Sequence, residues 1–380
     1  MATKPISTGA IPSGFDLDLE AAPPSILRRL HLDPPLLLGL LALCGFGLLV
    51  LYSAGDRNPL IVERQLLRLS LAFGFMCGVA QLSPVTLRNW SMPLYFLGVL
   101  MLIAVMLFGD IGKGAQRWLD FGFLRFQPSE ILKLGVPMAV AWLLSMRPLP
   151  PRLSWTFLAV ILILIPVLMI AEQPDLGTSL LVTSAGILVL FMAGLRWRII
   201  LALAVLIAAI APLVWFFAMH DYQRARVLTF LNPESDPLGT GYHIIQSQIA
   251  IGSGGISGKG WLNGTQSHLE FLPERHTDFI FAVIGEEFGL TGILALLVLY
   301  LFIILRGLVI AARAADNYGR ILAGGLTLVF FVYLFVNVGM VTGLLPVVGV
   351  PLPLISYGGT SMVTLMAGFG MLMSIETHKK

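Results

Sequence analysis

Charged residues are scarce in this 380-residue chain, of which Asp, Glu, Lys and Arg make up only 12%. A soluble globular protein carries about twice that fraction. The net charge is a modest +3, and no soluble face gathers Lys and Arg, so a nucleic-acid partner is not expected. Cys44 and Cys77 both lie inside apolar runs, which favours small buried side chains over a disulfide. His and Cys show no spacing typical of a metal site, so no metal-binding residues are predicted.

Apolar residues make up 57% of the chain and form long runs without charge. Runs of about 18 or more apolar residues predict membrane-spanning helices, because lipid offers no partner for bare backbone groups. We therefore expect an all-α polytopic membrane protein with about ten transmembrane helices. The predicted spans are 34–53, 66–83, 92–109, 128–146, 154–171, 177–195, 198–218, 279–305, 321–343 and 355–376.

The polar, Pro-rich residues 1–33 are expected to form a disordered cytoplasmic tail before a membrane domain at 34–377. The apolar run that follows is long for a signal-peptide core and lacks an A-x-A-like end, so it is interpreted as a retained helix. Lys and Arg are concentrated in the short segments on the side of the N-terminus, which predicts that both termini are cytoplasmic. That orientation places one large loop, about 219–278, outside; its Trp, Tyr and apolar stretches predict an ordered loop.

The segment GSGGISGKG (252–260) resembles a phosphate-binding loop only superficially. That motif needs Gly where Ser253 stands and Ser or Thr where Gly260 stands, and a βαβ unit around it. A glycine-rich turn is expected instead.

Polar residues gather near the outer ends of the fourth and neighbouring spans. Lys113, Arg117 and Arg125 accompany aromatic residues, a pattern that fits either interfacial anchors or a functional cluster of cations. Glu130 and Lys133 are three residues apart on an apolar helix and would meet on one face. Charge inside a membrane is costly, so this pair is expected to face the protein interior or a polar cavity, with a purely structural ion pair as the alternative.

Two aspartates stand where a helix begins. Asp175, in AEQPDLGTS (171–179), and Asp278, before the eighth span, each fit a helix cap or a functional carboxylate. The sequence leaves both alternatives open. The Pro- and Gly-rich segment 343–361, which ends at Ser361, cannot form a regular helix. At membrane depth such backbone is buried in protein or lines a cavity.

Taken together, these polar motifs resemble the SEDS family of cell-wall polymerases. They are GAQRWL (114–119), QPSE-x-x-K (127–133), QPDLGTS (173–179), QSQIAIGSGG-x-x-GKG (246–260), LPERHTDFIFAVIGEEFG (272–289) and ISYGGTS (355–361). The resemblance implies a ten-helix peptidoglycan glycosyltransferase that polymerises lipid II outside the bacterial cytoplasmic (inner) membrane. It also implies a class B penicillin-binding protein as the transpeptidase partner. Arg275 and the approach GTQSHLEFLPE resemble the branch that acts in cell elongation.

The resemblance also suggests roles for single residues. Asp278 matches the essential outer-loop aspartate of the family, and Glu130, Lys133 and Asp175 match polar residues of its central cavity. Arg117 and Ser361 match further motif positions, and Lys113 adds a cation beside them. We expect these seven residues to form the site, with Asp278 as the catalytic base.

The chemistry is consistent with that set of residues. Lipid II carries a disaccharide on undecaprenyl pyrophosphate, and joining two units inverts an α-phosphate into a β-glycoside. One carboxylate can deprotonate the acceptor hydroxyl. The pyrophosphate leaving group needs cations more than a proton, unlike the alkoxide of inverting glycosidases. A divalent cation, Mg²⁺ or Mn²⁺, is left open as a further bridge. A lipid II flippase and a non-catalytic scaffold are the alternative functions.

Overall fold

The computed structural model describes residues 30–112, 115–120, 125–219, 224, 228, 229, 240–268, 272 and 274–379. The predicted tail, up to residue 29, lies outside the described residues. So does Lys113, one of the predicted substrate-binding cations.

Ten helices of the described chain fall on the ten predicted spans, which confirms the polytopic helical fold. They are α2 (Pro34–Ala54), α3 (Pro59–Ala80), α4 (Pro84–Phe108), α5 (Pro128–Ser145), α6 (Leu153–Glu172), α7 (Leu176–Met192), α8 (Trp197–Leu213), α12 (Ile280–Ala312), α13 (Asn317–Val341) and α14 (Thr360–Thr377). Five of them, α2, α4, α6, α12 and α13, could cross a membrane by length and composition alone.

Two predicted starts were late, because hydropathy finds the apolar run and not the helix. α3 begins at Pro59 rather than 66, and α4 begins at Pro84 rather than 92. In each, a proline in the first turn follows a capping side chain: Asn58 accepts from the Leu60 N–H, and Ser83 from the Thr86 N–H. Proline suits the first turn and a polar cap satisfies a free N–H there, so both helices extend into their polar ends.

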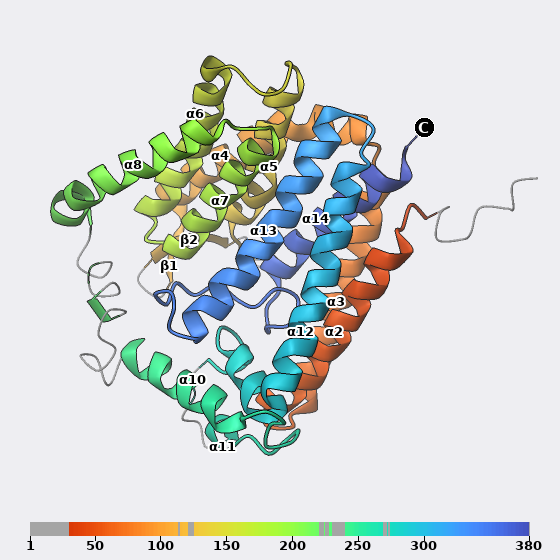
Figure 1. The fold of residues 1–380 in the computed structure, drawn as a ribbon, viewed down its shortest axis with the longest axis vertical. Coiled ribbons are helices and arrows are strands. Elements are labelled where there is room, and N and C mark those ends of the chain that lie inside the picture. The colour runs from red at the N-terminus through yellow and green to blue at the C-terminus, as the bar shows by residue number, and fades with distance from the viewer. Residues whose placement is uncertain are drawn as a thin grey trace, which may run out of the picture.

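Helix α13 forms the centre of the bundle. In its most apolar window 72% of the residues are buried, against 28% in α4 and in α6. Figure 1 shows α13 crossing the middle of the molecule, with α7 on one side and α12 on the other. Side chains on α13 are therefore well placed to organise a site inside the bundle.

The all-α prediction was incomplete. Between α4 and α5 the chain forms a small antiparallel sheet of β1 (Asp110–Gly112), β2 (Ala115–Asp120) and β3 (Arg125–Phe126), in the order β1-β2-β3. Leu119 pairs with Phe126 across β2 and β3. These strands are too short for their period to stand out in the sequence.

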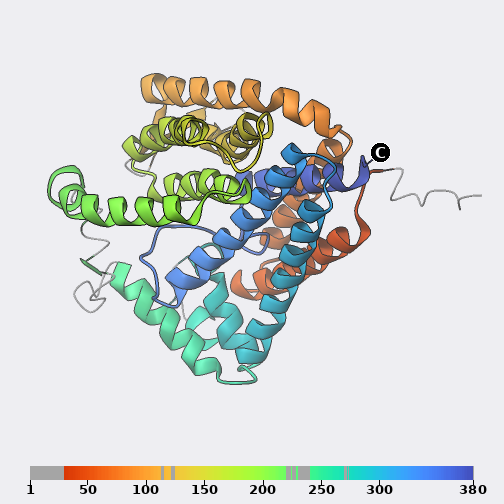
Figure 2. The same cartoon turned by 45° about the horizontal axis from the view of Figure 1, so that its top comes forward.

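The long loop is structured in its described part, as expected. It contains α10 (Thr240–Gly254) and α11 (Thr265–His268), and it follows a short π-helix, η1 (Val214–Ala218). Ser247 Oγ donates to the Val341 carbonyl at 2.7 Å, and Gln248 Nε2 donates to the Thr342 carbonyl at 3.0 Å. These bonds fasten α10 to the end of α13. Figures 1 and 2 both place α10 at an edge of the molecule, and in Figure 1 α6 lies at the opposite edge.

The glycine-rich segment predicted as a turn wraps around a kink in α12. At Gly289 the backbone leaves the helix with φ 62° and ψ −159°. The N–H groups of Lys259 and Gly260 donate to the carbonyls of Glu286 and Glu287 at 3.0 and 2.9 Å, and the Leu290 N–H donates to the Gly255 carbonyl at 3.0 Å. The turn thus satisfies backbone groups on both sides of the kink.

Replacing Gly289 with Ala is expected to destabilise the protein. The conformation at this residue is essentially restricted to glycine, and the strain costs about 1–3 kcal/mol. The added methyl group would also collide with the backbone nitrogen of Gly258. A lower thermal unfolding midpoint in detergent is the expected result. As a control, Gly74→Ala in α3 meets no atom within 4 Å and should keep or raise the midpoint. Equal midpoints for G289A and G74A would contradict this account of the kink.

Candidate active site

A polar cavity of about 280 Å³ lies where β2, the first turns of α5, α7 and α14, and the loop before α14 meet. Its wall includes five of the predicted site residues: Arg117, Glu130, Lys133, Asp175 and Ser361. They come from four separate motifs of the sequence, and the fold brings them to one place.

Asp278 lies in the turn before α12, beside this cavity. Gly349 belongs to the cavity wall. A methyl group added to Gly349 would lie 3.5 Å from Oδ2 of Asp278. The carboxylate therefore stands next to the wall segment that closes the cavity, on the side formed by the loop before α14.

Glu130 and Lys133 form a buried ion pair on α5. The Lys133 Nζ donates to Glu130 Oε1 at 2.7 Å, and the two side chains are 8% and 6% exposed. Glu130 Oε2 also accepts from Thr364 Oγ1 at 3.0 Å. Pro128 in the first turn of α5 and the three-residue spacing set both side chains on one face. Removing one partner alone would leave a buried charge without compensation.

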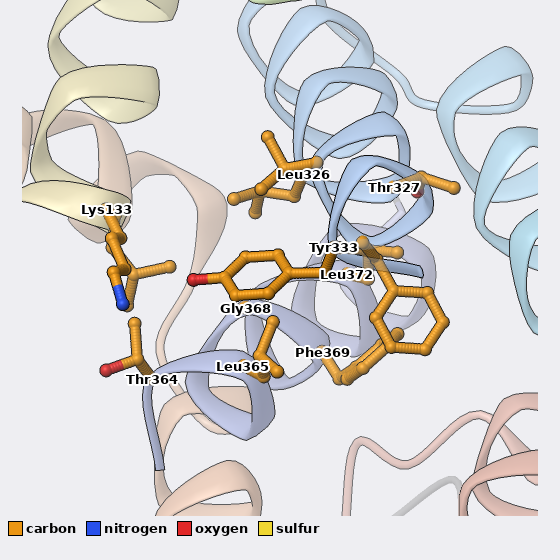
Figure 3. Close-up of a pocket in the computed structure, with 12 residues that line it drawn as sticks. Lys133, Leu326, Thr327, Tyr333, Thr364, Leu365, Gly368, Phe369 and Leu372 are labelled. Atoms are coloured by element: carbon orange, nitrogen blue, oxygen red, sulfur yellow. The ribbon is translucent and has the colours of Figure 1, made fainter. Parts of the chain in front are cut away.

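Tyr333 on α13 completes the surroundings of the lysine. The Lys133 Nζ lies 5.7 Å from the centroid of the Tyr333 ring. Figure 3 shows the tyrosine hydroxyl directed toward the Lys133 amine, with Thr364 nearby. The ammonium therefore has a carboxylate, an aromatic face and a hydroxyl around it, which holds it at the cavity wall.

Arg117 joins β2 to the turn between α6 and α7. Its Nε donates to the Gln173 carbonyl at 3.1 Å and lies 3.9 Å from Asp175 Oδ2, and its Nη2 donates to the Pro174 carbonyl. Two of its five N–H donors are used in these bonds within the protein. It therefore supplies positive charge to the cavity while acting as a brace for the turn.

Asp175 is a helix cap, as one of the two alternatives predicted, and it also lines the cavity. Oδ1 accepts from the Thr178 N–H at 3.1 Å and caps α7, while Oδ2 accepts from Gln127 Nε2 at 3.0 Å. The carboxylate of Asp175 therefore both caps α7 and forms part of the cavity wall.

Sequence reasoning missed Asn337, one of the two residues that hold the turn of Asp278. Asn337, fully buried on α13, donates through Nδ2 to the Asp278 carbonyl at 2.9 Å and to the Val350 carbonyl at 2.8 Å. Ser356 Oγ donates to the Thr277 carbonyl at 2.5 Å. A single amide within an otherwise apolar predicted span was the available signal, because a buried polar group needs hydrogen-bond partners.

Comparisons with known proteins agree with the fold and the motifs. The family model FTSW_RODA_SPOVE, described as "Cell cycle protein", matches residues 34–380. Peptidoglycan glycosyltransferase MrdB of Escherichia coli K12 is 58% identical over 352 residues, which cover 93% of this chain and 95% of that protein. Probable peptidoglycan glycosyltransferase FtsW of Geobacter metallireducens is 38% identical over 362 residues, covering 92% and 95%.

Solved structures are similar over nearly the whole chain. One comes from work on the structural coordination of polymerization and crosslinking by a peptidoglycan synthase complex. It has a TM-score of 0.79 at 34% identity, covering 90% of this chain and 97% of that chain. The rod shape determining protein RodA of Thermus thermophilus has a TM-score of 0.70 at 30% identity, covering 92% and 98%. The resemblance seen in the motifs is thereby confirmed, and the chain belongs to the FTSW_RODA_SPOVE family, the SEDS family of membrane proteins.

Proposed function

We propose that this protein is a peptidoglycan glycosyltransferase that polymerises lipid II into glycan strands. The names of MrdB and FtsW, which are similar along most of the chain, support this activity. The observation that carries the mechanism is that Asp278, which does not itself line the cavity, lies beside Gly349, a residue of the cavity wall that also includes Lys133 and Arg117. A carboxylate beside a cavity whose wall contains two cations matches the demands of the reaction.

In the proposed step Asp278 takes the proton from the acceptor hydroxyl as its oxygen attacks the anomeric carbon of the donor. A new glycosidic C–O bond forms and the bond from that carbon to the pyrophosphate breaks, with inversion. Charge develops on the departing pyrophosphate, where fixed positive groups stabilise it. Lys133 and Arg117 provide positive charge at this wall, so no second carboxylic acid is needed.

An apolar groove adjoins the polar cavity and suits the lipid tail of the substrate. It has a volume of about 320 Å³ and lies between α3, α4, α5 and α14. Glu130 lines both spaces. Phe75 and Trp90, which line the groove, are 54% and 61% exposed on the outside of the bundle. A polyprenyl chain could therefore enter from the membrane while its head group reaches the cavity.

A divalent cation would act at this site together with the substrate. Within the described residues, no group of three or more His, Cys, Asp or Glu side chains lies close enough to hold a metal ion. Mg²⁺ is commonly held by one or two carboxylates plus substrate phosphates. Asp278, Glu130 and Asp175 are the carboxylates available for that arrangement, and the ion would help to neutralise the departing pyrophosphate.

Both termini are proposed to be cytoplasmic, in the inner membrane of a bacterium. The rings of His31 and His378 stack with centroids 3.9 Å apart, and Arg306 Nη2 lies 2.6 Å from Asp33 and 3.6 Å from Glu376. These contacts put the ends of the first and last helices together at one end of the bundle, where Lys and Arg are frequent.

A class B penicillin-binding protein is the proposed partner. A synthase complex that couples polymerization to crosslinking supports it, because one of its chains is similar to this protein.

Purified full-length protein given labelled lipid II as its sole substrate tests the proposal. Glycan chains on a gel are the expected product, and addition of a chelator should slow their formation if a divalent cation takes part. Movement of lipid II across vesicles without glycan would identify a flippase instead. If neither glycan nor movement of lipid II is observed, a non-catalytic scaffold is the remaining function.

A further inference from the structure

Arg68 on α3 lies at the rim of the polar cavity and was not among the predicted site residues. Its guanidinium carbon lies 4.4 Å from the centroid of the Tyr357 ring. Its Cδ and Nε would lie 3.8 Å from a methyl group added to Gly359, and Gly359 lines the cavity. One turn earlier, buried Gln65 donates to the Ser356 carbonyl at 3.3 Å. This face of α3 is thus fastened to the loop that forms one side of the cavity.

The other cations described at the cavity wall are already engaged. Lys133 pairs with Glu130 at 2.7 Å, and Arg117 donates to the carbonyls of Gln173 and Pro174. Arg68, by contrast, makes no ion pair within the described part of the chain, and its guanidinium carbon lies over the ring of Tyr357. A guanidinium over an aromatic ring can keep the N–H groups on its edge available to donate to two oxygens of a phosphate.

The position of Arg68 also fits a head group continuous with the lipid tail. Phe75 and Val79 on the same helix line the apolar groove. They follow Arg68 by seven and eleven residues, so all three lie close to one stripe of α3. Seven residues of helix span about 10 Å. A lipid with its phosphate at Arg68 would therefore place its first isoprene units over the groove.

We propose that Arg68, held by Tyr357, binds a phosphate of the polyprenyl pyrophosphate at the rim of the cavity. This inference rests on the proposed function, since it assigns the donor or its released pyrophosphate carrier to that position. Arg68 is then a substrate-binding residue. Tyr357 is a positioning residue that orients the guanidinium.

Binding of undecaprenyl pyrophosphate to the purified full-length protein tests this assignment directly. Arg68→Gln is expected to weaken binding about 10- to 100-fold, the usual effect of losing a hydrogen bond to a charged group. It should raise the KM for lipid II similarly with a smaller change in kcat. Arg68→Lys keeps the charge but loses the planar fork, so an intermediate loss is expected. Undecaprenol, which has the tail without phosphate, should bind wild type and R68Q alike.

Arg147 offers a matched control, because its guanidinium also stacks on an aromatic ring, 4.5 Å from the centroid of Trp155. It follows the last turn of α5, whereas the polar cavity lies at the first turns of that helix. Arg147→Gln should leave the affinities for undecaprenyl pyrophosphate and for undecaprenol unchanged.

Tyr357→Phe keeps the ring and should match wild type, whereas Tyr357→Leu should weaken binding of the pyrophosphate. If R68Q does not fold, the comparison of Y357F with Y357L in binding undecaprenyl pyrophosphate tests the proposal.

Three results would overturn the inference: unchanged pyrophosphate affinity in R68Q, an equal loss in R147Q, or an equal loss of undecaprenol binding. Full competition by phosphatidylglycerol would also overturn it, because the site would then accept any lipid phosphate. Failure of the proposed function is a separate outcome. In that case the wild type would make no glycan, although R68Q would still lose affinity for undecaprenyl pyrophosphate selectively.

Discussion

Asp278→Asn should abolish glycan synthesis while the protein remains folded and still binds lipid II. Loss of a general base typically lowers a rate by roughly a hundred- to ten-thousand-fold. Asparagine has nearly the same shape as aspartate, but its amide cannot accept the proton of the acceptor hydroxyl. The hydrogen bonds from Asn337 and Ser356 to this turn go to main-chain carbonyls, so they should survive the substitution. The initial rate of polymerisation of labelled lipid II is the measurement.

Asp316→Asn is a suitable control for this experiment. Asp316 caps α13 by accepting from the Gly319 N–H at 2.9 Å, and asparagine caps a helix about as well as aspartate. D316N removes one carboxylate at the start of α13, the end of that helix opposite to Asn337 and the Asp278 turn, and it should polymerise like the wild type. Comparable rates in D278N and the wild type would exclude Asp278 as the base.

Lys133→Met is expected to have the second largest effect, and it should lower both the stability of the protein and its affinity for lipid II. It leaves Glu130 charged and buried without its ion-pair partner, which typically costs 3–5 kcal/mol of stability, so the thermal unfolding midpoint should fall. It also removes a cation from the wall of the cavity that we assign to the pyrophosphate. Loss of a charge-assisted hydrogen bond would weaken lipid II binding by about 10- to 100-fold.

The double variant E130Q/K133M separates those two effects. Neutralising Glu130 removes the uncompensated charge, and its amide can still bond to Thr364. The unfolding midpoint should therefore recover toward wild type, while lipid II binding and polymerisation stay low. Recovery of polymerisation in the double variant would show that the ion pair is only structural.

The spanning helices could be predicted because their signal is local. A run of apolar residues must form a helix in lipid, and backbone hydrogen bonding does not depend on neighbouring elements. The errors occur where that argument stops. Helices α3 and α4 extend past their apolar runs to Pro59 and Pro84, and β1 to β3 contain few residues each. At these places capping and sheet pairing decide the structure, and hydropathy carries no information about them.

The site was predictable only as a set of unusual residues. Charges inside apolar helices single out Glu130 and Lys133, because such charges are expensive unless they are paired. The partners depend on the fold. Asn337 donates a hydrogen bond to Asp278, which is 59 residues away in the sequence. Arg68 on α3 contacts the ring of Tyr357 in the loop before α14. Such contacts come from helix packing, which a single sequence does not reveal. They explain why Asp175 could be both a cap and part of a cavity wall.

The most direct test measures lipid II binding and glycan formation side by side in the wild type, D278N and K133M. A base beside the cavity and a phosphate-binding cation in its wall predict different effects of the two substitutions on binding and on catalysis. D278N should bind lipid II like the wild type and make no glycan, and K133M should bind poorly. If D278N instead formed glycan at the rate of the wild type, the account of this site would be wrong.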